Sequence, residues 1–132
     1  MKQLYVLRDG KAVAIDDPIE WADWFESSIA ERQLLLTRLS DRGVEHTQIS
    51  TAFIAINHNW TGEGPPLLWE TAIFYSVPEP ENSVRIEGRY ATRLEAVAGH
   101  HLVVAQLVER IAMSQGQRPE VVETGETSQE TN

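Results

Sequence analysis

The chain has 132 residues, no cysteine, and a formal net charge of −9 from 11 Lys+Arg and 20 Asp+Glu. This length fits a single domain, and the lack of cysteine excludes disulfides, cysteine-liganded zinc and a thiol nucleophile. The acidic balance argues against binding to nucleic acid or to an anionic membrane, because both attract Lys and Arg. We therefore expect an acidic cytoplasmic domain, with neither nucleic acid nor membrane among its partners.

The chain opens with a predicted hairpin. Apolar stretches at 3–7 and 11–15 are separated by Asp9-Gly10, a pair that accepts the positive φ angles of a type I′ turn. The strand at 3–7 is a candidate edge strand. An edge strand of this kind can pair with a second copy across a two-fold axis, so we also expect that a homodimer could form there.

A helix is predicted next, followed by an ambiguous segment. Asp17 can cap the helix and Pro18 suits its first position, with aromatic residues following at helical spacing; together they predict a helix over 18–28. Residues 31–40 are compatible with a helix or a strand. We favour a strand, because the turn signal at 40–43 would give it an antiparallel partner.

Three further strands are predicted from runs rich in β-branched and aromatic residues, at 44–57, 67–76 and 84–90. The first two are joined by a loop at 57–66 whose glycines and prolines forbid regular structure. Pro78 and Pro80 mark a turn before the third strand. Gly88 within that strand is typical of a β-bulge.

The second helix begins at Thr92, because Glu95 stands three residues later and completes a capping box. The segment 114–132 carries four Glu, one Arg and only two large apolar residues, so we expect a disordered or loosely docked acidic tail after a domain at 1–113. The apolar positions at spacings of three and four predict the buried face of the helix, namely Leu94, Val97, Ala98, His101, Leu102, Ala105, Val108, Ile111 and Ala112.

The predicted element order is β-β-α-β-β-β-β-α. Strands joined by short turns pair in antiparallel fashion, and amphipathic helices bury their apolar side against such a sheet. The sequence therefore predicts an α+β fold with a mainly antiparallel sheet of five or six strands and two helices packed on one face.

Three segments carry a resemblance to a known family: IEWADWFE at 19–26, the region from ISTAFIAINHNW to GPPLLWETAIF at 49–74, and RYATRLEAVAGH at 89–100. Together they resemble a family of small proteins encoded by tailed phages and prophages, over roughly residues 3–108. The stretch at 78–88 departs from the family pattern, which often has a shorter glycine-rich hairpin there. The resemblance implies a phage accessory protein in the host cytoplasm, and it implies no particular chemistry.

The loop at 57–66 is the first candidate functional site. Trp60 stands among small and polar residues, and an exposed aromatic side chain on a rigid loop is typical of an interface anchor. We therefore favour a binding protein over an enzyme, with a host or phage protein as its partner. The candidate binding residues are Asn57, His58, Asn59, Trp60 and Trp69. Alternatively, Trp60 and Trp69 fold onto the core and fix the shape of the loop.

A second hypothesis is a small metal-dependent hydrolase. His58, Glu70 and His100 could form a two-histidine, one-carboxylate site for Zn or Fe, or a general acid/base pair. No short metal-binding spacing supports this set, so no cofactor is expected. His101 lies on the predicted apolar stripe and suits the edge of the core, which leaves His100 as the better ligand. A third hypothesis is a small-ligand pocket beneath the 57–66 loop.

Overall fold

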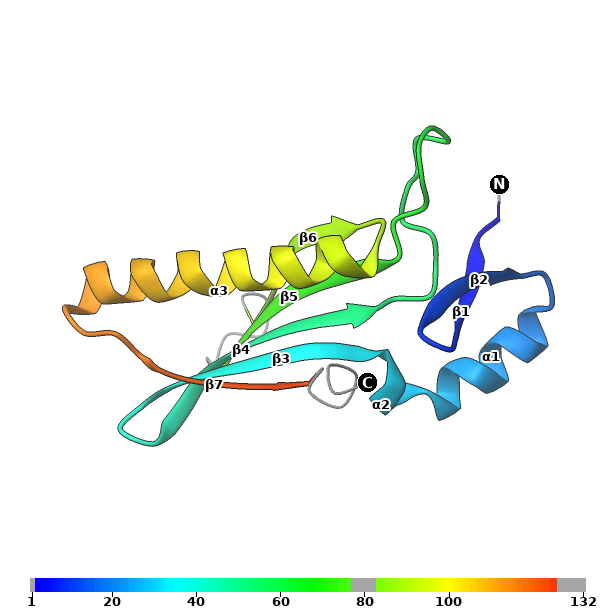
Figure 1. The fold of residues 1–132 in the computed structure, drawn as a ribbon. Coiled ribbons are helices and arrows are strands. Elements are labelled where there is room, and N and C mark those ends of the chain that lie inside the picture. The colour runs from blue at the N-terminus through cyan, green and yellow to red at the C-terminus, as the bar shows by residue number, and fades with distance from the viewer. Residues whose placement is uncertain (1, 77–82, 126–132) are drawn as a thin grey trace.

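The computed structural model describes residues 2–76 and 83–125, which form an antiparallel sheet crossed by a long helix, with a hairpin and short helices at one end (Figure 1). The predicted α+β class with a mainly antiparallel sheet is confirmed. The predicted turn at Pro78 and Pro80 lies outside the described residues. The helices are α1 (Pro18–Ser27), α2 (Ile29–Arg32) and α3 (Arg93–Gln115). The strands are β1 (Leu4–Arg8), β2 (Lys11–Ile15), β3 (Gln33–Asp41), β4 (Val44–Phe53), β5 (Trp69–Tyr75), β6 (Val84–Tyr90) and β7 (Glu120–Gly125).

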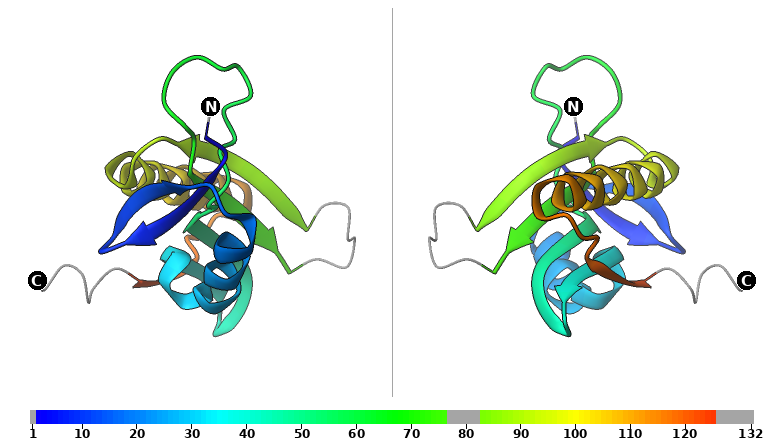
Figure 2. Two further views of the ribbon diagram at one scale, coloured as in Figure 1. Left: turned by 90° about the vertical axis from the view of Figure 1, so that its right-hand side faces the viewer. Right: turned by 90° about the vertical axis from the view of Figure 1, so that its left-hand side faces the viewer.

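The main sheet has the strand order β6-β5-β4-β3-β7, and every pair in it is antiparallel. The strand favoured for 31–40 is confirmed as β3, which follows the single turn of α2. Helix α3 runs along one face of this sheet (Figures 1 and 2). The core lies between them in two clusters. One is built around Leu35, Phe53, Trp69 and Ala96, and the other around Leu39, Ile49, Ile73, Val103 and Leu107.

The first two strands form a separate two-stranded sheet. Asp9 and Gly10 have φ angles of 53° and 78°, which confirms the predicted hairpin turn. The outer side of β1 is not free for a second copy, however. The Tyr5 N–H donates to the carbonyl oxygen of Ala55 at 2.9 Å, and Leu4 forms a bridge with Ile56. The segment that follows β4 thus occupies the edge on which the homodimer prediction rested.

Helix α1 closes one end of the sheet, whereas both helices were predicted to lie together on one face (Figure 1). Asp17 caps it as predicted and accepts from the Ile19 N–H at 2.9 Å. The aromatic residues of α1 decide its position. The Trp21 Nε1–H donates to the carbonyl oxygens of Tyr5 and Ala55, at 3.0 and 3.2 Å, and so ties the helix to the hairpin and to the end of β4.

Helix α3 begins with the predicted capping box of Thr92 and Glu95, but its buried face is rotated from the predicted one. Leu94 and Leu102 are 79% and 59% exposed. Apolar residues surround much of this helix, so periodicity alone did not determine which side faces the sheet. The side chains that it buries are Ala96, His100, Val103, Leu107 and Val108.

The C-terminal segment differs from the predicted tail. Helix α3 continues to Gln115, and β7 then pairs with β3 along six residues. The pairing is reinforced at its start by Glu120, whose carboxylate accepts from the Gly43 N–H at 3.1 Å. An edge strand gains backbone hydrogen bonds from one neighbour without burying large side chains, which is why the acidic composition concealed it. Residues 126–132 lie outside the described part of the chain.

Candidate functional site

The 57–66 loop joins β4 to β5 and projects from the end of the fold (Figure 1). The chain turns out of β4 at Ala55, which is fully buried and has a φ angle of 66°. This left-handed conformation is unusual for a residue with a Cβ, and the surrounding contacts hold it in place. The loop therefore leaves the sheet in a fixed direction.

Asn57 closes the base of the loop. Its side chain is 1% exposed, and its Oδ1 accepts from the N–H groups of Asn59 at 2.8 Å and Leu67 at 3.1 Å. One buried amide oxygen thus joins the outgoing and returning arms of the loop. The predicted binding residue Asn57 is consequently a structural part of the loop and not a surface contact.

Asn59 organises the tip in the same way. Its Nδ2 donates to the carbonyl oxygens of Glu63 at 2.7 Å and Pro65 at 2.8 Å. Its Oδ1 accepts from both the N–H and the hydroxyl of Thr61, at 3.1 and 2.6 Å. The loop lacks regular secondary structure, yet side-chain hydrogen bonds fix its backbone at both base and tip.

Trp60 is exposed at this tip, with 71% of its surface accessible. Its ring centroid lies 5.0 Å from that of His58, with the planes inclined by 42°. The His58 Nδ1–H donates to the carbonyl oxygen of Ile56 at 2.8 Å, which fixes the imidazole against the base of the loop. His58 therefore supports one side of an indole that otherwise faces solvent.

Replacing Asn57 by alanine is expected to lower the free energy of unfolding by about 1 kcal/mol, because two backbone N–H groups lose their buried acceptor. Urea unfolding followed by circular dichroism measures this loss. Asn59→Ala is the comparison, since its partners lie at the exposed tip where water can replace the amide; we expect a smaller loss. Equal losses in the two variants would contradict the role given to Asn57.

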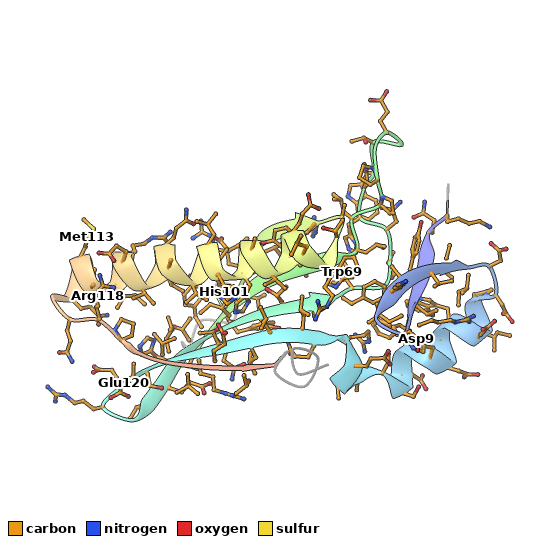
Figure 3. All side chains as sticks on the ribbon, viewed as in Figure 1. Asp9, Trp69, His101, Met113, Arg118 and Glu120 are labelled. Carbon is orange, nitrogen blue, oxygen red and sulfur yellow. The ribbon has the colours of Figure 1, made fainter. Side chains whose placement is uncertain are left out.

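Trp69 does not contribute to the surface of the loop. It is the first residue of β5 (Figure 3), and it is 5% exposed. Its ring packs edge-to-face on Phe53 at 5.1 Å. The prediction that Trp69 contacts a partner directly is therefore corrected. Trp69 lies within the strand predicted at 67–76, and only its closeness to Pro65 and Pro66 associated it with the loop.

The structure does not bring His58, Glu70 and His100 together. Glu70 accepts from Arg89 Nε at 2.9 Å across the β5–β6 pair. The His58 imidazole is hydrogen-bonded to the backbone of the loop, and His100 is buried on the side of α3 that faces the sheet. In the described ranges, no group of three or more His, Asp or Glu side chains is placed to hold a metal ion.

The two adjacent histidines of α3 exchange their predicted places. His100 is fully buried, whereas the His101 side chain is 52% exposed. Burial lowers the pKa of His100 from its ordinary value of 6.5 to about 4, and the neighbouring His101 adds a smaller effect in the same direction. A fully buried neutral imidazole is not the accessible ligand that the sequence suggested.

His100 is instead the centre of a hydrogen-bond network between α3 and the sheet. Its Nε2 lies 2.8 Å from the hydroxyl of Thr37 on β3, and its Nδ1 lies 2.7 Å from the hydroxyl of Thr51 on β4. Thr51 in turn lies 2.5 Å from the hydroxyl of Thr71 on β5. All three threonines are buried, so every member of the network is paired inside the core.

The ends of this network determine the direction of its hydrogen bonds. The carboxylate of Glu123 on β7 can only accept, so the Thr37 hydroxyl donates its single hydrogen to it, at 3.4 Å. Thr37 must then accept from the Nε2–H of His100. The Nδ1 of His100 is then the acceptor of its other bond. At the opposite end the Tyr90 hydroxyl donates to Thr71 at 3.1 Å. One neutral tautomer of His100 satisfies the whole chain of bonds.

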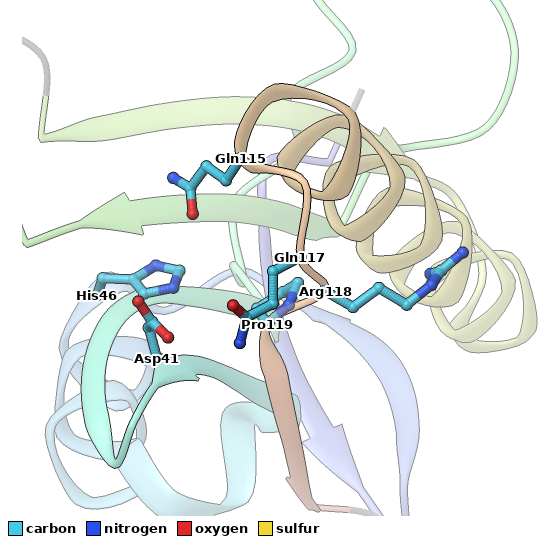
Figure 4. A pocket seen from close by; sticks show the side chains of 6 residues that line it. All are labelled: Asp41, His46, Gln115, Gln117, Arg118 and Pro119. Atoms are coloured by element: carbon cyan, nitrogen blue, oxygen red, sulfur yellow. The ribbon is translucent and has the colours of Figure 1, made fainter.

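A pocket of about 120 Å³ lies at the C-terminal end of α3 (Figure 4). It is not the pocket predicted beneath the 57–66 loop, which adjoins the other end of the fold (Figure 1). Its lining includes Arg118, which is paired with Glu109 at 2.7 Å. The lining residues are polar and include Asp41, His46, Gln115, Gln117, Arg118 and Pro119.

Among the described residues, no helix is long and apolar enough to cross a membrane. Comparison of the chain with protein-family models, with curated proteins and with solved structures gives no match.

Proposed function

We propose that this chain is a non-enzymatic binding protein that docks onto another protein through its 57–66 loop, with Trp60 as the anchor. The observation that carries the proposal is a large aromatic side chain, 71% exposed, on a loop whose backbone is already fixed. Tryptophan is enriched among the residues that dominate binding energy, and a rigid loop loses little conformational entropy on binding. Both features favour recognition of a partner surface.

The class of partner follows from the resemblance noted in the sequence. A small phage accessory protein would engage a host or phage protein in the host cytoplasm. The high acidity of the chain, with a net charge of −9, disfavours nucleic acid as that partner.

Affinity capture from host lysate and from phage-infected lysate tests this proposal. Trp60→Ala is expected to reduce recovery of the specific partner at least tenfold, since truncation of an anchor of this kind costs about 2 kcal/mol or more. Its melting temperature should match that of the unmodified protein, because the indole is exposed.

Met113→Ala provides the matched control, because Met113 is 82% exposed at the distant C-terminal end of α3 (Figure 3). Recovery of the partner should be unchanged in this variant. The proposal fails if the unmodified protein, Trp60→Ala and Met113→Ala all recover the same proteins in equal amounts.

A further inference from the structure

Trp60 and Glu63 lie on one tight turn at the tip of the 57–66 loop. The carbonyl oxygen of Glu63 accepts from Asn59 Nδ2 at 2.7 Å and from the Thr61 hydroxyl at 3.1 Å. The Glu63 N–H donates back to Thr61 Oγ1 at 3.1 Å. These bonds join Asn59, Thr61 and Glu63, so they fix the chain on both sides of Trp60, and both exposed side chains belong to one fixed turn.

The Glu63 carboxylate is the single formal charge of this loop, whose sequence is NHNWTGEGPP with neutral histidine. Within the described part of the chain, no hydrogen bond or ion pair engages this carboxylate. Lys2, whose carbonyl oxygen lies 3.5 Å from Asn57 Nδ2 at the base of the loop, is already paired with Asp16. Among the described residues, the tip thus carries a carboxylate without a partner three positions after an exposed aromatic side chain.

These two groups match the chemistry of arginine. A guanidinium stacks on aromatic faces, with tryptophan the best of them, and its planar fork of N–H donors fits a carboxylate. Lysine presents a compact, strongly hydrated charge that stacks less well. A chain with a net charge of −9 also attracts a basic partner over a longer distance.

We infer that the partner segment recognised by the 57–66 loop carries an arginine whose guanidinium stacks on Trp60 and pairs with Glu63. This inference rests on the proposed function, because it names the chemistry of the partner at the same loop. It assigns Trp60 the apolar and cation–π contact and Glu63 the charge-assisted hydrogen bonds.

The test uses the full chain and three short acetylated peptides in which glycine alternates with arginine, with lysine or with citrulline. Citrulline keeps the shape of arginine and removes its charge. The readout is the NMR signal of the Trp60 indole N–H and of the Glu63 amide during titration. We expect saturable shifts with the arginine peptide, binding about fivefold weaker with the lysine peptide, and no binding with the citrulline peptide.

Two variants separate a specific contact from general attraction to an acidic protein. Glu63→Gln is expected to weaken binding of the arginine peptide about fivefold, which corresponds to one exposed charged contact. Glu26→Gln on α1 has the same net charge and should change the affinity less than twofold. Equal effects of the two variants, or equal binding of the arginine and citrulline peptides, would overturn the inference.

The inference and the proposed function can fail separately. A captured partner that needs Trp60 but binds Glu63→Gln with unchanged affinity, at low and high salt alike, contradicts the arginine contact and leaves the docking loop standing. A partner that binds Trp60→Ala as well as the unmodified protein contradicts the docking loop itself.

Discussion

Replacing Gly99 by alanine is expected to lower the free energy of unfolding by about 2 kcal/mol, although alanine is the better helix former by about 1 kcal/mol. A Cβ at this position of α3 would lie 2.3 Å from Cε1 and 2.4 Å from Cζ of Tyr90. The Tyr90 ring also lies close against Gly88, where a Cβ would be 2.5 Å from the Tyr90 hydroxyl. The ring therefore has little room to move away from α3. Alanine at 99 must therefore displace Tyr90 and break its hydrogen bond to Thr71. Urea unfolding measures the change.

A second substitution reverses the sign of this effect. In a Tyr90→Ala background the obstructing ring is gone, so Gly99→Ala is expected to stabilise the protein by about 1 kcal/mol through helix propensity alone. In a Tyr90→Phe background the ring remains, and Gly99→Ala should stay destabilising. Stabilisation by Gly99→Ala in the unmodified protein would show that α3 and β6 do not meet as closely as the structure places them.

Local signals in the sequence predicted the elements that depend on neighbouring residues. The hairpin turn at Asp9-Gly10 and the capping box of Thr92 and Glu95 each involve residues within a few positions of one another. The bulge at Gly88 is likewise confirmed, since the register between β5 and β6 shifts next to the Thr71–Gly88 pair. Such features are encoded by the chemistry of short segments, and so they can be derived from one sequence.

The polar network under α3 could not be derived in this way. Thr37, Thr51 and Thr71 lie on three different strands, and only the register of the sheet aligns them beneath one helix position. These contacts also determine which side of α3 faces the sheet. The apolar periodicity placed His101 on the buried side of the helix, whereas the structure buries His100. The one available signal was the repeated occurrence of threonine at strand positions where aliphatic residues are usual, which indicates buried hydroxyl groups in need of a partner.

The candidate site was partly predictable for a related reason. Glycines and prolines marked the 57–66 loop, and Trp60 is exposed on it. Trp69 lies within the strand predicted at 67–76, but which side of that strand faces the core follows from its register with β4, which one sequence does not define. The structural role of Asn57 depends on a hydrogen bond to Leu67, ten residues away.

Acidification is expected to destabilise the fold through His100. Its pKa of about 4 in the folded protein lies below the value of 6.5 expected when the chain unfolds, because burial in the core disfavours the cation. The folded state therefore binds fewer protons than the unfolded state between these two values. The contribution of His100 to stability is fully present above about pH 6.5 and is lost as the pH falls towards about 4.

The expected loss is about 3 kcal/mol of unfolding free energy, at 1.36 kcal/mol for each pKa unit separating the two states. Urea unfolding at a series of pH values measures it. His101 and, through Thr37, Glu123 are other ionisable groups close to His100, so the quantity of interest is the difference in unfolding free energy from a variant without the His100 imidazole.

His100→Gln is that variant, because glutamine offers one acceptor for Thr51 and a donor for Thr37 without a titrating ring. Its free energy of unfolding should be lower than that of the unmodified protein at pH 7. This difference in unfolding free energy should become smaller as the pH approaches 4. His101→Gln keeps the buried imidazole and should retain most of the original pH dependence. If the difference in unfolding free energy between the unmodified protein and His100→Gln stays constant over this pH range, His100 is not held neutral by its burial between α3 and the sheet.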